Sequence, residues 1–281
     1  MKTESVKSKF ILCAILFIVL TIVLYGFFIE PYRIDTHHIM IKDKSLGKVL
    51  NGLVAVHLSD IHIKYIGRRE KEILKIINEL KPDLIFLTGD YVEWRSDYAP
   101  ALTFLSQLHA PHGVFAVMGD YDYSVNSRKS CLFCHEPLSG SPTRKHTVRF
   151  LKNGIERIDL PKGPLWIGGI DFEENGSLSE EQMRFFFGRQ PIILLSHTPL
   201  AFDRIDNNSE VFMLAGDTHG GQMPLPAFLW KFLGYEKCAR YLHGFYNEGN
   251  KKLYVSRGIG TSHVPFRFFC RPELVVFHFT S

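Results

Sequence analysis

The stretch Ala215-Gly216-Asp217-Thr218-His219-Gly220-Gly221-Gln222 places an acid and an imidazole on a turn directly after the apolar run Val211 to Leu214. Far earlier in the chain, Ser59-Asp60-Ile61-His62 follows the apolar run Leu53 to Leu58 in the same way. An α/β domain builds its site from polar residues at the carboxyl ends of buried strands. The two stretches therefore predict an α/β fold with a functional site at the edge of a sheet.

Three further apolar runs end in the same kind of residue. Asp90 follows Leu84 to Thr88, Asp120 follows Val114 to Met118, and His197 follows Ile192 to Leu195. One such feature could be a turn acid or a satisfied polar histidine. Five in series favour a metal centre instead.

The pattern between these runs predicts alternating strands and helices. Apolar residues at helical spacing predict an amphipathic helix over Arg68 to Leu80. It connects two strands, which indicates a parallel sheet covered on both faces. Further helices are expected over Ala99 to Leu108 and Leu178 to Phe187, and a surface excursion over Ser124 to Lys145. The later runs are expected to form a second sheet: Val148 to Leu151, Leu165 to Ile170, Ile192 to Leu195, Val211 to Leu214, Leu253 to Ser256 and Leu274 to Phe279.

An uncharged apolar run, Phe10 to Ile29, stands near the beginning of the sequence. At about 1.5 Å per residue it is about 30 Å long, the thickness of the hydrocarbon core of a bilayer. It has no amphipathic face, unlike a core helix, and no small-residue cleavage site follows it. We therefore expect a tail and transmembrane anchor over residues 1–30, a polar connector over 31–50 and a catalytic domain over 51–281.

The charge balance is mild. The chain has a net charge of +4, from 33 Lys and Arg against 29 Asp and Glu. This suits anionic lipid or phosphate and does not indicate nucleic acid as a partner. Basic residues flank the apolar run on both sides, so the positive-inside rule does not orient it.

The strand-end acids and histidines exceed what one metal ion needs. They are Asp60, His62, Asp90, Asp120, His197, Asp217 and His219. Such a set suits two divalent metal ions about 3.5–4 Å apart that share a carboxylate. A metal pair of this kind binds phosphoryl oxygens and lowers the pKa of a water for attack on phosphorus.

The motif set resembles the calcineurin-like metallophosphoesterase superfamily, whose motifs run D-x-H, G-D, G-N-H-[DE], a lone H and G-H-x-H. The resemblance extends from Leu53 to the C-terminus, and it implies a four-layer αββα sandwich of two mixed sheets with a two-metal site. By position it implies that Asp60, His62 and His219 hold the first metal and that Asp90 bridges. Asp120, His197 and Asp217 would hold the second metal.

The chain departs from the family motifs at the second metal. It has Asp120-Tyr121 where the family has Asn-His, and Asp217 where the family has the first His of G-H-x-H. Each changed metal position keeps an oxygen ligand, and the site now holds four carboxylates. We therefore expect Mn²⁺, with Mg²⁺ or Fe²⁺ also compatible, in preference to zinc. The added charge weakens the attraction of substrate phosphate, and Arg257 and Arg267 are the cations expected to compensate.

Asp120 and Tyr121 are the predicted catalytic pair. Tyr121 stands where the family has a histidine that assists the leaving group. A phenol with a pKa of about 10 donates a hydrogen bond but is a weak acid at neutral pH. An alkoxide leaving group needs a proton, whereas a phosphate leaving group hardly does. The substitution therefore favours cleavage of a pyrophosphate over an alkyl phosphodiester.

The segment Pro224 to Tyr246 is rich in apolar and aromatic residues, including Phe228 and Trp230. It is either a core helix with a loop or a surface that binds acyl chains of a substrate beside the metals. A different set of short stretches resembles the closing segment of the membrane-associated branch of the superfamily: Gly220 to Gln222, Ser256 to Gly260, Pro265 to Arg267 and Arg271 to Glu273. That branch includes membrane-anchored UDP-2,3-diacylglucosamine pyrophosphatases of lipid A biosynthesis, which release UMP and lipid X.

The branch implies a phosphorylated lipid or nucleotide-sugar lipid as substrate and a single-pass anchor in the inner membrane. A UDP-linked substrate requires the domain at the cytoplasmic face. Two alternatives stay open: a general phosphodiesterase or phosphatase of the cell envelope, and a metal-binding pseudoenzyme that acts as a membrane scaffold.

Overall fold

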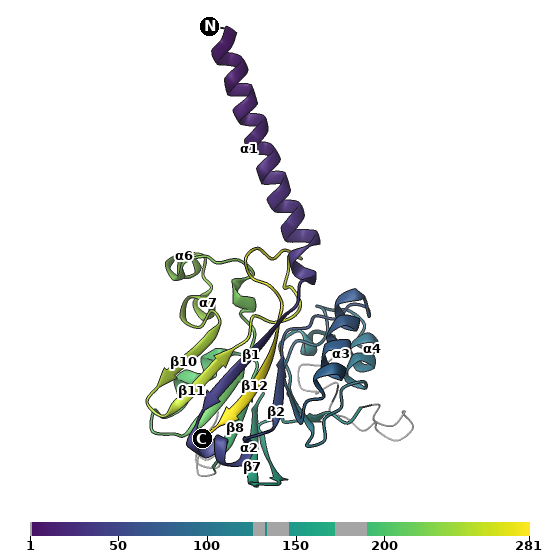
Figure 1. The fold of residues 1–281 in the computed structure, drawn as a ribbon, viewed down its shortest axis with the longest axis vertical. Helices are drawn as coiled ribbons and strands as arrows, with labels where there is room; N and C mark the ends of the chain where they lie inside the picture. The colour runs from purple at the N-terminus through teal and green to yellow at the C-terminus, as the bar shows by residue number, and fades with distance from the viewer. Residues whose placement is uncertain (1, 126–132, 134–145, 172–189) are drawn as a thin grey trace.

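A long helix leads into a domain of two packed sheets (Figure 1). The computed structural model describes residues 2–125, 133, 146–171 and 190–281. Helix α1 (Lys2–Phe28) projects from the domain, and the segment Lys7–Tyr32 contains an 18-residue stretch that has a mean hydropathy of 2.9 and is almost entirely exposed. It is long and apolar enough to cross a membrane, which suggests a membrane anchor.

The first sheet has the strand order β1-β12-β2-β3-β4-β5. Its strands are β1 (Asp35–Lys42), β12 (Glu273–Thr280), β2 (Val54–Leu58), β3 (Leu84–Thr88), β4 (Val114–Val117) and β5 (Arg149–Phe150). β12 is antiparallel to β2 and parallel to β1, while β2 to β5 are mutually parallel. The sheet is therefore mixed.

The second sheet has the order β10-β11-β9-β8-β7-β6. Its strands are β10 (Gly244–Glu248), β11 (Lys251–Val255), β9 (Val211–Ala215), β8 (Ile192–Ser196), β7 (Gly163–Ile170) and β6 (Gly154–Leu160). The four central strands are parallel, and β6 and β10 are antiparallel edges. This sheet is mixed as well.

Three apolar layers hold the domain together. Helices α3 (Arg68–Leu80) and α4 (Ala99–Leu105) pack on the outer face of the first sheet through residues such as Ile73 and Phe104. A second layer lies between the sheets, and the 3₁₀ helix η4 (Pro199–Arg204) packs with a third layer on the second sheet. The predicted fold class, two mixed sheets with helices, is confirmed.

The segment predicted as a connector, residues 31–50, is part of this fold. It contains the end of η1 (Glu30–Tyr32), then β1 and helix α2 (Lys44–Leu50). β1 is an edge strand with mostly exposed side chains, so its sequence lacks the apolar signal of a buried strand. α2 is short, is capped by the Asp43 carboxylate and packs Leu46 and Leu50 between the sheets.

Two strands predicted for the second sheet lie in the first. Val148 to Leu151 contains β5 and Leu274 to Phe279 lies in β12, and both pair in the first sheet. A strand's position along the chain does not reveal its partner when the chain returns to an earlier sheet, as β12 does between β1 and β2. The helix expected over Leu178 to Phe187 and most of the excursion over Ser124 to Lys145 lie outside the described residues.

The strand directions place the carboxyl edge of the first sheet at the end where α1 joins the domain. β1 begins beside α1, and β12 is parallel to β1. β2 is antiparallel to β12, so its carboxyl end lies where β1 begins. β3 and β4 run parallel to β2 and end at the same edge.

Candidate metal centre

The residues predicted to bind metal follow the carboxyl ends of five strands from both sheets. Asp60 and His62 follow β2, Asp90 follows β3, Asp120 follows β4, His197 follows β8, and Asp217 and His219 follow β9. Five of these residues have left-handed backbone conformations: Asp60, His62, Asp90, Asp217 and His219, with φ between 49° and 74°. Such backbone costs free energy and clusters at functional sites.

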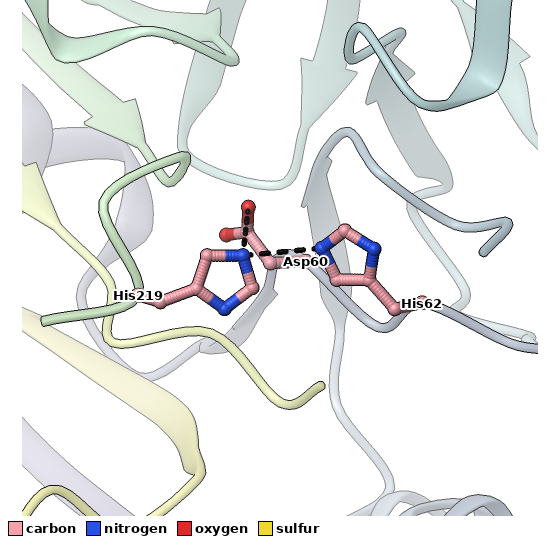
Figure 2. A group of neighbouring side chains, drawn as sticks. All are labelled: Asp60, His62 and His219. Atoms are coloured by element: carbon pink, nitrogen blue, oxygen red, sulfur yellow. Dashed lines mark hydrogen bonds and ion pairs between the residues drawn. The ribbon is translucent and has the colours of Figure 1, made fainter. Parts of the chain in front are cut away.

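The first cluster is Asp60, His62 and His219 (Figure 2). The Nε2 atoms of the two imidazoles lie 3.1 Å apart, and His219 Nε2 lies 3.5 Å from Asp60 Oδ1. All three side chains are buried. Figure 2 shows the two rings directed toward each other with the carboxylate beside them, so one metal ion can contact all three.

The second cluster is Asp120, His197 and Asp217. His197 Nε2 lies 3.3 Å from Asp120 Oδ1 and 3.9 Å from Asp217 Oδ1. Asp90 lies between the two clusters, with Oδ2 3.4 Å from His62 Nε2 and Oδ1 3.6 Å from His197 Nε2. The two oxygens of Asp90 are therefore placed to contact one ion each.

The donor atoms of these side chains fit divalent metal ions. His197 Nδ1 lies 2.8 Å from the carbonyl oxygen of Thr88, an acceptor that fixes a proton on Nδ1 and directs Nε2 toward the carboxylates. Burial raises the pKa of Asp60 to about 6 and lowers the pKa of His62 and His219 well below its usual range. Neutral imidazoles and clustered carboxylates are the ligands that divalent ions take.

Glycines allow the loops that carry these ligands to approach closely. A Cβ atom on Gly119 would lie 2.1 Å from Asp90 Oδ1. A Cβ atom on Gly216 would lie 1.8 Å from Ser59 Oγ and 2.3 Å from Asp60 Oδ2. Because no side chain fits at either position, both glycines are required for the two clusters to meet.

Asp122 positions the loops after β3 and β4. Its buried carboxylate accepts hydrogen bonds from the backbone N–H groups of Asp90 (2.8 Å), Tyr91 (2.8 Å) and Gly119 (2.9 Å). It stands at the final acidic position of the G-N-H-[DE] motif, so the sequence did contain its signal. It binds backbone rather than facing the cluster, which assigns it a positioning role.

Tyr121 lies beside the first cluster. Its ring packs edge-on against His62 with centroids 4.5 Å apart, and its hydroxyl lies 3.2 Å from His263 Nδ1. Its backbone N–H donates to Asp90 Oδ1 at 3.0 Å. Burial and the Asp90 carboxylate raise the pKa of Tyr121, so the side chain is a neutral phenol at physiological pH.

A cavity of about 720 Å³ opens over the clusters. Its lining includes Asp90, Asp120, Asp217, His219 and Tyr121. Its other lining residues include Trp94, Trp230, Tyr235, His263 and Val264. The cavity is therefore lined both by the acids and histidine of the clusters and by aromatic and apolar residues.

The two arginines predicted to compensate the carboxylates do not line this cavity. Arg267 is fully buried, and its guanidinium donates to backbone carbonyl oxygens, including that of Gly260. Arg257 is ion-paired with Glu273 and Asp35. Both arginines hold irregular loops together by satisfying carbonyls and acids, so the structure does not bring them into the cavity with the clusters.

Among the described residues, Lys237 is a cation that lies at the clusters. Its ammonium forms an ion pair with Asp217, and its side chain is partly exposed and lines the cavity. It comes from the short helix α7 (Glu236–Arg240), and no sequence motif marks it. Of the two aromatic residues predicted to contact substrate, Trp230 lines the cavity, whereas Phe228 points into solvent with 70% of its surface exposed.

Comparison with known proteins agrees with this site. The profile of the family described as Calcineurin-like phosphoesterase matches residues 53–244. The chain is 31% identical over 274 residues to the uncharacterized metallophosphoesterase YkuE of Bacillus subtilis, covering 92% of this chain and 89% of YkuE. It is 29% identical over 208 residues to phosphodiesterase YaeI of Escherichia coli, covering 70% of each.

A further relative is UDP-2,3-diacylglucosamine pyrophosphatase LpxG of Chlamydia trachomatis. It is 27% identical over 274 residues, covering 80% of this chain and 83% of LpxG. The family match includes both clusters, from Asp60 to His219. The chain therefore belongs to the calcineurin-like phosphoesterase family and is a metal-dependent hydrolase of phosphoric esters or anhydrides.

Proposed function

We propose that the protein is a membrane-anchored pyrophosphatase that cleaves a nucleotide-sugar lipid, with UDP-2,3-diacylglucosamine as the best candidate. The products would be UMP and 2,3-diacylglucosamine 1-phosphate, the lipid X of lipid A biosynthesis. The observation that carries this proposal is the phenol of Tyr121 beside the first cluster, where the family has an imidazole.

The phenol discriminates between leaving groups. Because its pKa is raised by burial and by Asp90, Tyr121 can orient a leaving oxygen by a hydrogen bond but transfers a proton poorly. A nucleotide phosphate leaves as a stable anion and needs orientation more than a proton. His263 bonds the same hydroxyl and directs it.

The other residues of the cavity have separate tasks. Bound divalent ions would polarise the phosphoryl oxygens and lower the pKa of the attacking water. Asp90 holds the two clusters at a fixed separation. Lys237 reduces the negative charge around Asp217 and leaves the cavity attractive to a pyrophosphate, and Trp230 contributes to an apolar wall for a sugar or acyl chain.

The relatives and the anchor support the lipid substrate. LpxG, whose name states this pyrophosphatase activity, covers most of the chain, and α1 is long enough to keep the domain at a bilayer. We place the domain at the cytoplasmic face of the inner membrane, because UDP-linked substrates are made in the cytoplasm. The carboxylate-rich second cluster favours Mn²⁺, with Mg²⁺ or Fe²⁺ as alternatives.

A second candidate is a general phosphodiesterase of the membrane surface. The relative YaeI is named a phosphodiesterase, and the cavity is wide enough to accept several phosphoric esters. On this alternative, Tyr121 selects esters with stable leaving groups but the lipid is not required.

Release of UMP from UDP-2,3-diacylglucosamine in vesicles, measured with Mn²⁺, tests the proposal. We expect turnover by the full chain and its loss in Asp90→Ala. Hydrolysis of an aryl phosphodiester without release of UMP would favour the general phosphodiesterase. Absence of turnover on both substrates with Mn²⁺, Mg²⁺ and Fe²⁺ would favour the metal-binding scaffold.

A further inference from the structure

Large apolar side chains are exposed at the end of the domain that carries α1. We call this group the anchor-end surface: Phe28, Phe228, Phe232, Leu233, Val264 and Phe269. Phe232 is 85% exposed and Phe269 is 77% exposed. Soluble surfaces rarely leave aromatic rings this open in a group, so the anchor-end surface requires a partner.

Helix α6 (Ala227–Phe232) presents its aromatic residues to solvent on one side. Phe228 and Phe232 are four residues apart, so they share a face of the helix. Trp230 lies between them in sequence, is buried, and packs against Gly221 in the wall of the cavity. Figure 1 shows α6 at the end of the domain from which α1 projects. One face of α6 therefore closes the cavity while the other is apolar and uncovered.

The end of α1 is fixed to the domain rather than joined by a free linker. The ring of Phe266 packs on Gly26, where a Cβ atom would lie 2.1 Å from it, and Arg267 N–H donates to the carbonyl oxygen of Gly26 at 3.0 Å. The buried carboxylate of Glu30 accepts from the Cys270 N–H at 2.5 Å. The helix consequently determines how the domain is oriented toward a bilayer.

The loop that contains Phe266, Arg267 and Cys270 links the anchor to the cavity. Gln222, at the end of the metal-binding turn, accepts the N–H of Ser262 at 2.8 Å through its side chain and that of Phe268 at 2.9 Å through its carbonyl. Its side-chain amide donates to the carbonyl oxygen of Val264 at 3.2 Å. Ser262 and Val264 line the cavity, so anchor, loop and cavity wall form one connected unit.

We propose that the anchor-end surface inserts into the lipid bilayer that α1 crosses, so that the cavity opens at the level of the lipid headgroups. The inference rests on the membrane anchoring in the proposed function but not on the identity of the substrate. Exposed cations adjoin the apolar residues: Lys231 precedes Phe232, and Arg271 follows Phe269 by two positions. Aromatic residues flanked by such cations match the interface of an anionic bilayer.

Spin labels on the full chain in anionic phosphatidylglycerol vesicles test the insertion. The background carries Cys13, Cys131 and Cys134 as alanine, while Cys238 and Cys270 are buried and remain. Single cysteines then replace four exposed residues: Phe232 and Phe269 as probes, Phe17 in α1 as the bilayer control, and Met40 as the aqueous control. Met40 pairs with His278 near the end of β12, far from α1 (Figure 1).

Collision with oxygen, which partitions into lipid, is compared with collision with a water-soluble nickel chelate. We expect labels at residues 232 and 269 to resemble residue 17, with nickel accessibility at least fivefold below that of residue 40. If labels at residues 232 and 269 are as accessible to nickel as residue 40 while residue 17 is protected, the insertion is wrong, although α1 still crosses the bilayer.

Two further outcomes also contradict the proposal in distinguishable ways. Nickel access at residue 17 as well would show that α1 does not cross the bilayer, which removes the basis of both the anchor and the insertion. Broadening of the signal at residue 232 that increases with the protein-to-lipid ratio would identify a second copy of the chain as the partner. If the labels at residues 232 and 269 are protected from nickel but the proposed hydrolysis is not observed, the insertion is supported and the proposed function is contradicted.

Discussion

The two clusters of the metal centre differ in chemistry and in exposure. The first cluster has two imidazoles and one carboxylate, all buried, and within the described part of the chain no Lys or Arg pairs with its carboxylate. The second has two carboxylates and one imidazole, the Asp120 side chain is 36% exposed, and Lys237 pairs with Asp217. We infer that the first cluster is a rigid and tight ion site, whereas the second binds its ion more weakly and faces the substrate.

The departures from the family motifs explain this asymmetry. Two of them, Asp120 and Asp217, lie in the second cluster, whereas Tyr121 packs against His62 of the first. The extra carboxylates add negative charge, and Lys237 restores part of the balance. We infer that these changes alter how charge and protons are supplied to the substrate.

Asp90→Ala should have the largest effect, because Asp90 lies between the two clusters, with one oxygen near His62 and the other near His197. We expect hydrolysis of an aryl phosphodiester to fall by a factor of more than about 100, since loss of even an indirect metal partner costs roughly 10- to 100-fold. The assay is run with saturating Mn²⁺, and thermal unfolding confirms folding. Asp159→Ala, at an exposed position on β6, is the matched control. Activity within threefold of the parent would show that the clusters do not act as a pair.

His62→Ala and Asp120→Ala compare the clusters directly. Metal content after dialysis should fall by about one ion per chain in His62→Ala, because the buried cluster is the tight site. Asp120→Ala should retain that ion and need roughly tenfold more Mn²⁺ for half-maximal activity, equivalent to about 1.4 kcal/mol. Elemental analysis and a Mn²⁺ titration measure the two effects. Loss of the tightly bound ion in Asp120→Ala but not in His62→Ala would contradict the assignment of the first cluster as the tight site.

Tyr121→Phe removes the phenol hydroxyl and keeps the ring against His62. We expect kcat to fall about tenfold on an alkyl phosphodiester, whose leaving group gains from a hydrogen-bond donor. On a pyrophosphate or a nitrophenyl ester the decrease should stay within about threefold, as a lost hydrogen bond of about 0.5 kcal/mol predicts. Equal decreases in kcat on both kinds of substrate would contradict the argument that Tyr121 discriminates between leaving groups.

Lys237→Gln should have the smallest effect. Removing a partly exposed ammonium frees Asp217 for the ion of the second cluster, and such pairs contribute about 0.2–1 kcal/mol. The affinity for the second Mn²⁺, measured by calorimetry, should therefore rise by up to about fivefold, while KM for a phosphodiester rises. Lys231→Gln, on the exposed surface of α6, is the matched control. Weaker binding of the second ion in Lys237→Gln would mean that the lysine supports that site.

Predictions from the sequence were most accurate where apolar strands run straight into ligands. Helix α3 and strand β3 have the bounds that their periodicity predicts. Six of the seven predicted metal ligands form two adjoining clusters, and the seventh, Asp90, lies between them. They were least accurate at the edges of the sheets. β1 exposes most of its side chains, so it reads as a polar connector although its backbone completes the first sheet.

The predictions about positively charged residues also failed where tertiary contacts decide the outcome. Arginine in a loop after a metal motif suggests a phosphate ligand, but Arg267 is surrounded by backbone carbonyls and Arg257 by acids. Lys237 lies twenty residues beyond Asp217 in a segment marked only by its apolar residues. Side-chain partners of this kind depend on how loops fold over the sheet edge, and local pattern does not encode that.

The sequence by itself determined the family and predicted the ligand set and the anchor, because strand ends and long apolar runs are local features with a fixed physical meaning. Only the tertiary structure decided which residue balances the charge of the second cluster and where the site lies relative to α1. Both depend on contacts between segments that are distant in the chain. The antiparallel return of β12 between β1 and β2 brings the carboxyl edge of the sheet to the anchor, and this pairing exists only in the folded domain.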